Sequence, residues 1–298
     1  MNERTVQCGD GLRRVVADDL AKPLPKFIDD MGAHLAKRHG VVAVLFYGNI
    51  LRDAKAAGLL DFYVLTESDR AYHGRGLSAL ANRLLPPNVY HEVFEDRHAK
   101  VAVMSVASFA HRMRRESWDT TLWTRFSQST RLVYADDLSR AIVVDAIVTG
   151  WRTAAFWADA LTANESDVGA SRWTTLFTQT YGVELRPEGG SNRASRIVET
   201  SADLFAQIDA ELPISNPSPD AIRGILRAWR WRRAAGKPLN ILRLLKAVFT
   251  FRGGAEYAMS KLDKHTDGES FLKPWERRHP WLAAPGVLLR LVRRNRNS

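Results

Sequence analysis

The stretch from Val44 to Leu65, which reads VLFYGNILRDAKAAGLLDFYVL, constrains the fold of this chain more than any other. It joins two short apolar runs, 41–47 and 59–65, that are rich in β-branched, leucine and aromatic residues. Apolar runs of this length, bounded by turn or helix signals, are typical of buried β-strands. We therefore predict two buried strands connected by a short helix.

Two residues of this stretch carry chemical information. Gly48 ends the first run, and a glycine there lets backbone N–H groups approach a phosphate at the start of a helix. Asp61 is a lone acid in the second run, and a buried carboxylate is costly unless a metal ion or strong donors hold it. This order of elements resembles the way polymerase-β-like nucleotidyltransferases bind a nucleoside triphosphate with its magnesium ion. The simpler alternatives are a glycine that only ends a strand and a structural acid at a strand end.

Composition narrows the range of partners. The 298 residues carry a formal net charge of +10, which favours an anionic partner such as a nucleotide, a nucleic acid or a lipid headgroup. A single cysteine, Cys8, excludes an intrachain disulfide framework, and the histidines show no zinc-binding spacing. We expect no secretory signal, and no uncharged apolar stretch reaches the roughly 18 residues that span a bilayer. The expected location is cytoplasmic, with peripheral membrane association.

The first 140 residues predict an α/β unit. Besides the two strands above, apolar runs predict strands at 99–107 and 132–134. Helical periodicity predicts helices at 23–37, 77–85 and 108–130, the second ended by Pro86 and Pro87. We expect a polar loop at 66–73. Residues 1–140 are therefore interpreted as a nucleotidyltransferase domain with a mixed sheet.

From Ala141 onward the apolar positions recur at helical spacing. This pattern predicts helices at 141–161, 171–181 and 195–212, so we interpret residues 141–218 as a helical domain, with a winged-helix arrangement as one option. A linker at 213–220, PISNPSPD, leads into a basic amphipathic C-terminal region, residues 219–298. The expected fold class is α/β (α+β), a mixed-sheet domain followed by a mostly helical part.

Six separated blocks of the chain, between about residues 46 and 265, resemble one family in the same order. They are YGN with LDFYV, SDRAYH, AKVAVMS, SWDTTLWTRFSQSTRLVY, TYGVELRPEGGSNRASRIVE and NILRLLKAVFTFRGGAEYAMSKLDKH. The family is the mitochondrial-type phosphatidate cytidylyltransferases, which are CDP-diacylglycerol synthases of the polymerase-β-like superfamily. None of the blocks is specific alone, and the resemblance depends on their shared order.

The resemblance implies a reaction in which CTP and phosphatidate give CDP-diacylglycerol and pyrophosphate, with Mg²⁺, at a membrane surface. It implies catalytic roles for Asp61 and Lys100. The nucleotide-binding roles it implies fall on Tyr47, Gly48, Asn49, His73, Arg186 and Arg193. Asp61 is the expected magnesium ligand, because magnesium prefers oxygen ligands. A second acid is expected nearby, with Asp53 and Asp69 as candidates and Glu92 and Glu95 as weaker ones.

Some residues depart from the family pattern. Asn49 stands where the family has serine, Lys100 is followed by Val-Ala instead of Tyr-Gly, and Glu184 stands where the family has aspartate. We expect these changes to affect the acceptor more than the chemistry. Several assignments also have plainer alternatives: His73 as a packed loop histidine, Lys100 as a solvated strand start, and Arg186 and Arg193 as surface charges.

The C-terminal tail interleaves apolar and basic residues. Trp275 and Trp281 accompany a leucine- and valine-rich run that is flanked by arginines. This pattern is typical of an interfacial helix on an anionic membrane, whereas nucleic-acid binding and packing against the protein are the alternatives. The alternative functions are therefore nucleotidyl transfer to another lipid phosphate or to RNA, and a non-catalytic relative that binds membranes. The sequence leaves the nucleotide base, the lipid acceptor and the oligomeric state open.

Overall fold

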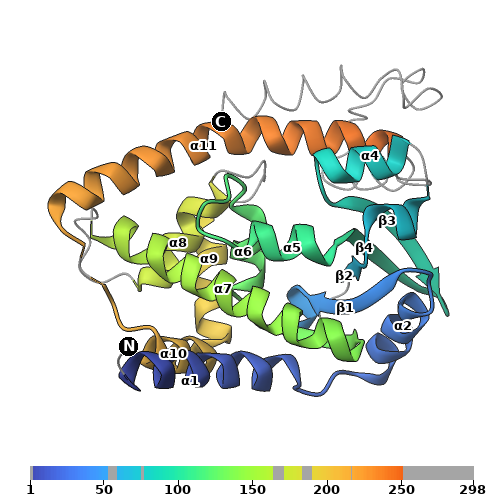
Figure 1. Cartoon of the computed structure of the whole chain (residues 1–298), viewed down its shortest axis with the longest axis horizontal. Coiled ribbons are helices and arrows are strands. Elements are labelled where there is room, and N and C mark those ends of the chain that lie inside the picture. The colour runs from blue at the N-terminus through green and yellow to red at the C-terminus, as the bar shows by residue number, and fades with distance from the viewer. Residues whose placement is uncertain are drawn as a thin grey trace.

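A computed structural model of the chain describes residues 3–52, 59–74, 77–163, 171–182, 190–215 and 217–250. Its centre is a five-stranded sheet with the strand order β3-β4-β2-β1-β5 (Figure 1). The strands are β1 (Val41–Tyr47), β2 (Leu60–Thr66), β3 (Asn88–Phe94), β4 (Arg97–Ser105) and β5 (Thr130–Ala135). Because β2 and β4 run parallel while the other neighbouring pairs are antiparallel, the predicted mixed sheet is confirmed.

The two strands predicted from the central stretch are β1 and β2. They pair antiparallel, with Tyr47 directly opposite Asp61. The described part of the connection is η1 (Asn49–Leu51), a single turn of 3₁₀ helix. Residues 53–58 of the connection, including Asp53, lie outside the described residues.

One face of the sheet is covered by α2 (Lys26–Ala36), within the helix predicted at 23–37. Its fully buried side chains Ile28, Met31 and Leu35 pack against Phe46 and Phe62 of the central strands. A fully buried side chain of this kind stabilises the fold by about 1.5–3 kcal/mol relative to its exposed state. The strands read as continuous apolar runs because helices cover both faces of the sheet.

The helices on the other side of the sheet are α1 (Glu3–Leu20), α5 (Val106–Arg112), α6 (Thr121–Phe126), α7 (Asp137–Thr162), α8 (Arg172–Tyr181), α9 (Gly190–Thr200) and α10 (Ala202–Glu211). Of these, α1, α5 and α7 pack against the strands, and α8, α9 and α10 pack against other helices. One apolar cluster joins Leu45 and Tyr63 of the sheet to Trp151 of α7 and Trp173 of α8. The sheet and the helices after residue 140 therefore share a core, which crosses the domain boundary predicted there.

Within the described residues, the central helix α7, of 26 residues, is the one helix long and apolar enough to cross a membrane by length and composition. Charged residues such as Arg152 interrupt it, so it contains no uncharged apolar stretch of the length considered above. In addition, 67% of its apolar window is buried inside the protein. The apolar character of α7 is accounted for by its place in the core, where Trp151 and Trp157 are almost fully buried.

The long helix α11 (Pro219–Thr250) runs along one side of the molecule, from the helical end to α4 (Leu77–Leu84) and β3 (Figure 1). Trp229 anchors its first half by packing against Trp157, with ring centroids 5.3 Å apart. Arg232 donates hydrogen bonds to the carbonyl oxygens of Ser117 and Arg115. The predicted amphipathic tail, including Trp275 and Trp281, lies outside the described residues.

The helix predicted at 108–130 is wrong as a single element, because the chain forms α5 and α6 with a loop between them. Polar side chains in the loop take over backbone donors: the Ser117 hydroxyl accepts from the Asp119 N–H, and Asp119 Oδ1 accepts from the Thr121 N–H. Short polar side chains compete with helical hydrogen bonds in this way. Likewise, β4 ends earlier than predicted, because the Ser105 hydroxyl caps α5 by accepting from the Ser108 N–H.

Four further differences from the sequence-based expectation concern α3, the predicted helix at 195–212, β3 and α1. The predicted polar loop at 66–73 contains α3 (Asp69–His73), capped by the Ser68 hydroxyl. The predicted helix at 195–212 is divided at Ser201 into α9 and α10. Strand β3 was not predicted, because its burial is only partial and its residues lack a continuous apolar run. Helix α1 was also not predicted.

Candidate functional site

Gly48 and Asp61 form the centre of the candidate site. Gly48 has φ +112° and ψ −161°, a backbone conformation that is essentially restricted to glycine. A side chain there would also collide with its neighbour, since an added Cβ would lie 3.0 Å from Asp61 Oδ2. The turn after β1 and the carboxylate of β2 are therefore in direct apposition.

Lys100 joins this centre from the neighbouring strand. It is the register partner of Asp61 in the parallel β2–β4 pair. Side chains of paired residues project from the same face of a sheet, where Tyr47 and Tyr63 also lie. Arg125 of α6 covers these aromatic rings, with its guanidinium carbon 5.2 Å from the Tyr47 ring centroid and 5.9 Å from that of Tyr63. Tyr47, Gly48, Asp61 and Lys100 are thus brought together.

Asn49 takes part in a polar network beside the Gly48 turn. Its Oδ1 accepts a hydrogen bond of 2.6 Å from an Arg52 amino group, and the other Arg52 amino group donates to Gln128 Oε1 at 3.2 Å. Gln128 in turn donates to the Tyr181 hydroxyl at 2.9 Å. The amide of Asn49 therefore positions a guanidinium at the turn.

Arg193 of α9 completes this side of the site. Its guanidinium carbon lies 5.6 Å from the centroid of the Tyr181 ring. Its Nε atom is buried and makes no hydrogen bond within the described part of the chain. Burial lowers the pKa of the Arg52 guanidinium, and the like charges of Arg193 and Arg196 lower it further. This concentration of guanidinium groups favours an anionic ligand, which would relieve the repulsion and supply acceptors.

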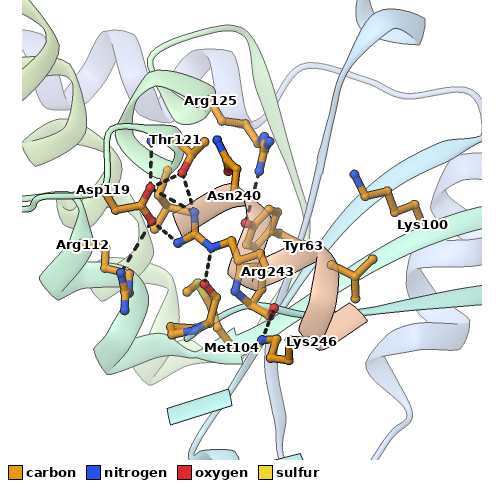
Figure 2. A pocket seen from close by; sticks show the side chains of 14 residues that line it. Tyr63, Lys100, Met104, Arg112, Asp119, Thr121, Arg125, Asn240, Arg243 and Lys246 are labelled. Atoms are coloured by element: carbon orange, nitrogen blue, oxygen red, sulfur yellow. Dashed lines mark hydrogen bonds and ion pairs between the residues drawn. The ribbon is translucent and has the colours of Figure 1, made fainter. Parts of the chain in front are cut away.

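A cavity of about 140 Å³ opens beside Lys100 and Tyr63 (Figure 2). It lies between the sheet, the α5–α6 segment and the distal half of α11. The charged side chains that line it are Lys100, Arg112, Asp119, Arg125, Arg243 and Lys246. The lining is therefore strongly cationic.

Asp119 organises the cavity wall. It is almost fully buried and forms ion pairs with Arg243 and Arg112, and it accepts a hydrogen bond from the Thr121 hydroxyl. Burial alone would raise the pKa of the Asp119 carboxyl, but the two arginines outweigh it and the pKa is lowered. The carboxylate therefore stays ionised and fixes both guanidinium groups.

Lys246 forms the rim of the cavity. Its ammonium group donates hydrogen bonds to the carbonyl oxygens of Leu85 and Pro87, the latter at 2.7 Å. Burial lowers the pKa of Lys246 to about 8, and the nearby charges of Arg243 and Arg112 act in the same direction. The cavity therefore holds more positive charge than its own carboxylate neutralises.

Asp69 and His73 lie elsewhere. They belong to α3, which follows the far end of β2. A strand rises about 3.3 Å per residue, so Thr66 at that end of β2 is about 17 Å from Asp61. Asn82 donates to Asp69 Oδ1 at 2.8 Å, and His73 lies 2.9 Å from the Tyr90 hydroxyl through Nδ1. In this arrangement Asp69 cannot share a metal ion with Asp61, and His73 packs in a separate polar network.

Glu92 pairs with Arg38, with an oxygen–nitrogen distance of 2.5 Å. Its register partner is Ala99, which belongs to the α2 side of the sheet, so Glu92 lies on the opposite face from Asp61 and Lys100. Glu95 lies just after β3, at the turn before β4. Asp53 and Arg186 lie outside the described residues, as does Glu184.

Among the described residues, no group of three or more His, Cys, Asp and Glu side chains could hold a metal ion. Asp61 is the carboxylate at the Gly48 turn, and its partner across the strands is Lys100. Magnesium commonly takes only one or two protein carboxylates together with substrate phosphates and water. A single carboxylate such as Asp61 is compatible with a Mg²⁺ ion whose other ligands would be water and phosphate oxygens.

Sequence reasoning missed most of the cationic residues in the site. Arg112, Arg125, Arg243 and Lys246 are separated along the chain and meet only at the cavity, and Arg52 lies at the Gly48 turn. Three of them, Arg125, Arg243 and Lys246, fall within the blocks that carry the family resemblance, which was the available signal.

No protein-family model matches this chain, and no curated protein is significantly similar to it.

Proposed function

We propose that this protein is a nucleotidyltransferase that transfers a nucleotide from a nucleoside triphosphate to a phosphorylated acceptor. The specific form we propose is a phosphatidate cytidylyltransferase, which makes CDP-diacylglycerol and pyrophosphate from CTP and phosphatidate at a membrane surface. The sheet and the Gly48 turn would then belong to a polymerase-β-like domain. The peripheral, cytoplasmic location is part of the same proposal.

The apposition of Gly48 and Asp61 is the observation that carries this proposal. A glycine-specific turn keeps side chains away from one end of β1, which leaves backbone N–H groups accessible to a phosphate. The carboxylate of Asp61 lies beside this turn and has Lys100 as its register partner, and a metal-bound triphosphate would give it a chemical role. The guanidinium groups of Arg52 and Arg193 supply the positive charge that a triphosphate needs.

The proposed reaction places limited demands on the protein. An oxygen of the acceptor phosphate attacks the α-phosphorus, a new O–P bond forms, and the bond to the bridging oxygen breaks to release pyrophosphate. A phosphate monoester is already ionised at neutral pH, so no general base is required. Negative charge grows on the leaving pyrophosphate, and fixed cations such as Arg52 and Arg193 stabilise it without reorganisation.

Magnesium fits this scheme as a substrate-borne cofactor. Asp61 would provide the protein ligand, and the triphosphate oxygens and water would provide the rest. When bound, the ion neutralises phosphate charge and polarises the reacting phosphoryl group. Lys100, across from Asp61, would hold acceptor or phosphate oxygens by its ammonium group.

A second candidate is a nucleotide-binding relative without catalytic activity. The observation that favours it is that, within the described part of the chain, Asp61 belongs to no group of three or more acidic, histidine or cysteine side chains that could hold a metal ion. In that case the cationic site would bind a triphosphate and release it unchanged. Transfer to RNA instead of a lipid is a further alternative, consistent with the net positive charge.

A single assay separates these functions. The purified protein is incubated with α-labelled CTP, ATP, GTP and UTP, Mg²⁺, and either short-chain phosphatidate, glycerol 3-phosphate or tRNA. We expect label from CTP to appear in the lipid product, with stoichiometric pyrophosphate. Label in tRNA would replace the lipid assignment by an RNA one. Binding of triphosphate without any product would favour the non-catalytic relative.

A further inference from the structure

The cavity beside Lys100 is separate from the guanidinium cluster at the Gly48 turn. The turn cluster consists of Arg52, Arg193 and Arg196 together with Asn49, Gln128 and Tyr181. None of these residues lines the cavity, whose walls come from β2, β4, the α5–α6 segment and α11. The site therefore has two cationic regions, with Asp61 and Lys100 at the junction between them.

The cavity is built for an anion. Five of its lining side chains are cationic, and Asp119 is the one carboxylate among them. Figure 2 shows Asp119 between Arg112 and Arg243, with Lys246 and Lys100 on other sides of the cavity. Because Asp119 neutralises only one charge, the lining keeps a formal excess of four positive charges.

The cations are held in place before any ligand binds. Asp119 and the Pro86 carbonyl oxygen fix Arg243, and the latter accepts from Arg243 Nε at 3.2 Å. Lys246 is fixed by two backbone carbonyl oxygens. Arg125 donates to the Tyr63 hydroxyl at 3.3 Å. Preorganised charge of this kind favours a ligand that presents several acceptor oxygens at once.

We propose that this cavity is a phosphomonoester-binding subsite, and that it presents the phosphate of the acceptor to the nucleotide at the Gly48 turn. This inference rests on the nucleotidyltransferase function proposed above. A phosphate group offers the three oxygens and the dianionic charge that this lining matches. The cavity volume of about 140 Å³ is well above the roughly 10–15 Å³ that a cavity needs in order to hold one water molecule.

Lys100 connects the two regions. It lines the cavity, and it is also the register partner of Asp61. A phosphate in the cavity that reaches Lys100 therefore lies next to the carboxylate at the Gly48 turn. Arg125 has the same double position, because it lines the cavity and covers the ring of Tyr47 just before Gly48.

Apolar side chains near the cavity favour a lipid as the source of the phosphate. Leu84 of α4 and Leu242 of α11 are 72% and 52% exposed, and each belongs to an element that leads to the cavity rim. Leu80, one turn before Leu84, is also exposed. Exposed leucines beside a cationic cavity suit an acyl chain attached to a phosphate headgroup.

Equilibrium binding tests the proposal without requiring turnover. Short-chain phosphatidate, glycerol 3-phosphate and inorganic phosphate are titrated into the full-length protein by calorimetry, in the wild type and in Lys246→Met. We expect Lys246→Met to weaken phosphatidate binding about 10- to 100-fold, because a charge-assisted hydrogen bond is lost. Lys246→Arg should restore most of the affinity. Arg227→Gln removes an exposed charge from the same helix and should leave binding unchanged.

The outcomes separate this proposal from the proposed function. If Lys246→Met and Arg227→Gln both bind phosphomonoesters as tightly as the wild type does, the cavity is not the subsite. The same conclusion follows if the wild type binds no phosphomonoester, even where nucleotidyl transfer is observed. If the cavity binds phosphomonoesters but no nucleotide is transferred, the proposed function fails while the subsite stands. Tighter binding of phosphatidate than of glycerol 3-phosphate identifies a lipid source, and equal affinity identifies a soluble one; both support a phosphomonoester subsite. The unfolding midpoint of each variant, measured by circular dichroism, shows that the binding data refer to folded protein.

Discussion

Asp61 and Lys100 are partners across the parallel β2–β4 pair, so a carboxylate and an ammonium group leave the same face of the sheet side by side. On one side of this pair lies the Gly48 turn, with Arg52 and Arg193 nearby. On the other lies the cationic cavity that Lys100 lines. The pair therefore stands where a bound nucleotide and a bound acceptor phosphate would meet in the proposed reaction.

We expect Asp61→Asn to abolish nucleotidyl transfer while the protein stays folded. An amide is a far weaker magnesium ligand than a carboxylate. Removal of a residue that only hydrogen-bonds to a metal ligand typically lowers activity roughly 10- to 100-fold, and the loss of turnover in Asp61→Asn should exceed this. Turnover of labelled CTP in the purified variant, compared with its circular dichroism spectrum, provides the measurement. Near-normal turnover in a folded variant would remove Asp61 from the active site.

Gly48→Ala should lower both stability and triphosphate affinity. The backbone conformation of Gly48 costs about 1–3 kcal/mol for a residue with a side chain, and the new Cβ would press on Asp61. Chemical denaturation and CTP titration measure the two effects. Gly224→Ala is the matched control, because Gly224 lies in α11 with open space around it and should gain up to about 1 kcal/mol. Equal behaviour of the two variants would show that the turn is not strained.

Asn49→Ser should be tolerated, whereas Asn49→Leu should raise the apparent constant for triphosphate. Leucine removes the acceptor that holds Arg52 and puts an apolar group where phosphate oxygens need donors. Steady-state kinetics with varied CTP at fixed acceptor provide the test. Unchanged kinetics in the leucine variant would mean that this turn does not touch the nucleotide.

Phosphomonoester binding should weaken as the pH rises through about 8. Lys246 has its pKa lowered to about 8 by burial and by Arg243 and Arg112, with Asp69 opposing the shift, so it loses its charge in that range. His73 and Asp119 also lie near these groups, but the pKa of each is lowered, so their charges do not change around pH 8. The ligand stays a dianion above its second pKa of about 6. Phosphomonoester titrations between pH 6.5 and 9 should show this loss of affinity in the wild type. The loss should be smaller in Lys246→Arg, because arginine stays charged over this range. An equal decline in both proteins would exclude Lys246 as the titrating group.

The same shift has a consequence for stability. Folding lowers the pKa of Lys246 from its ordinary value of 10.5 to about 8. Between these two pH values the native protein therefore binds fewer protons at Lys246 than the unfolded chain does. Lys246 therefore destabilises the fold at neutral pH, and this penalty is relieved as the pH rises through that window. Lys246→Met should lose this pH dependence in chemical denaturation.

Removal of the tail from Pro274 onward should weaken binding to anionic vesicles and lower activity on bilayer substrate, with triphosphate binding unchanged. Each lysine or arginine near an anionic surface contributes about 1 kcal/mol, and the tail's tryptophans and leucines add apolar burial. High salt should reduce vesicle binding without eliminating it, because the apolar part is not screened. Vesicle sedimentation measures this. Loss of tRNA binding with vesicle binding intact would favour the nucleic-acid alternative.

The sequence was most informative where a local pattern has one structural solution. Two apolar runs around a glycine predicted β1 and β2 within one residue, because buried strands require continuous apolar residues. Helix α2 and the body of α7 followed from helical periodicity in the same way. The break between α5 and α6 was missed, because hydrogen bonds from Ser117 and Asp119 decide it and apolar spacing does not report them.

The sequence by itself determined the Gly48–Asp61 element, since the glycine turn and the acid-bearing strand are neighbours along the chain. Only the tertiary structure decided which other charges join them. It separated Asp69 and His73 from Asp61 by the length of β2, and it brought Arg243 and Lys246 of α11 to the cavity beside Lys100. Helical periodicity specifies which face of a helix is apolar, but not where along the molecule that helix packs. The positions of these charges depend on packing between distant segments, such as Trp229 on Trp157, and such contacts leave no local pattern to predict from.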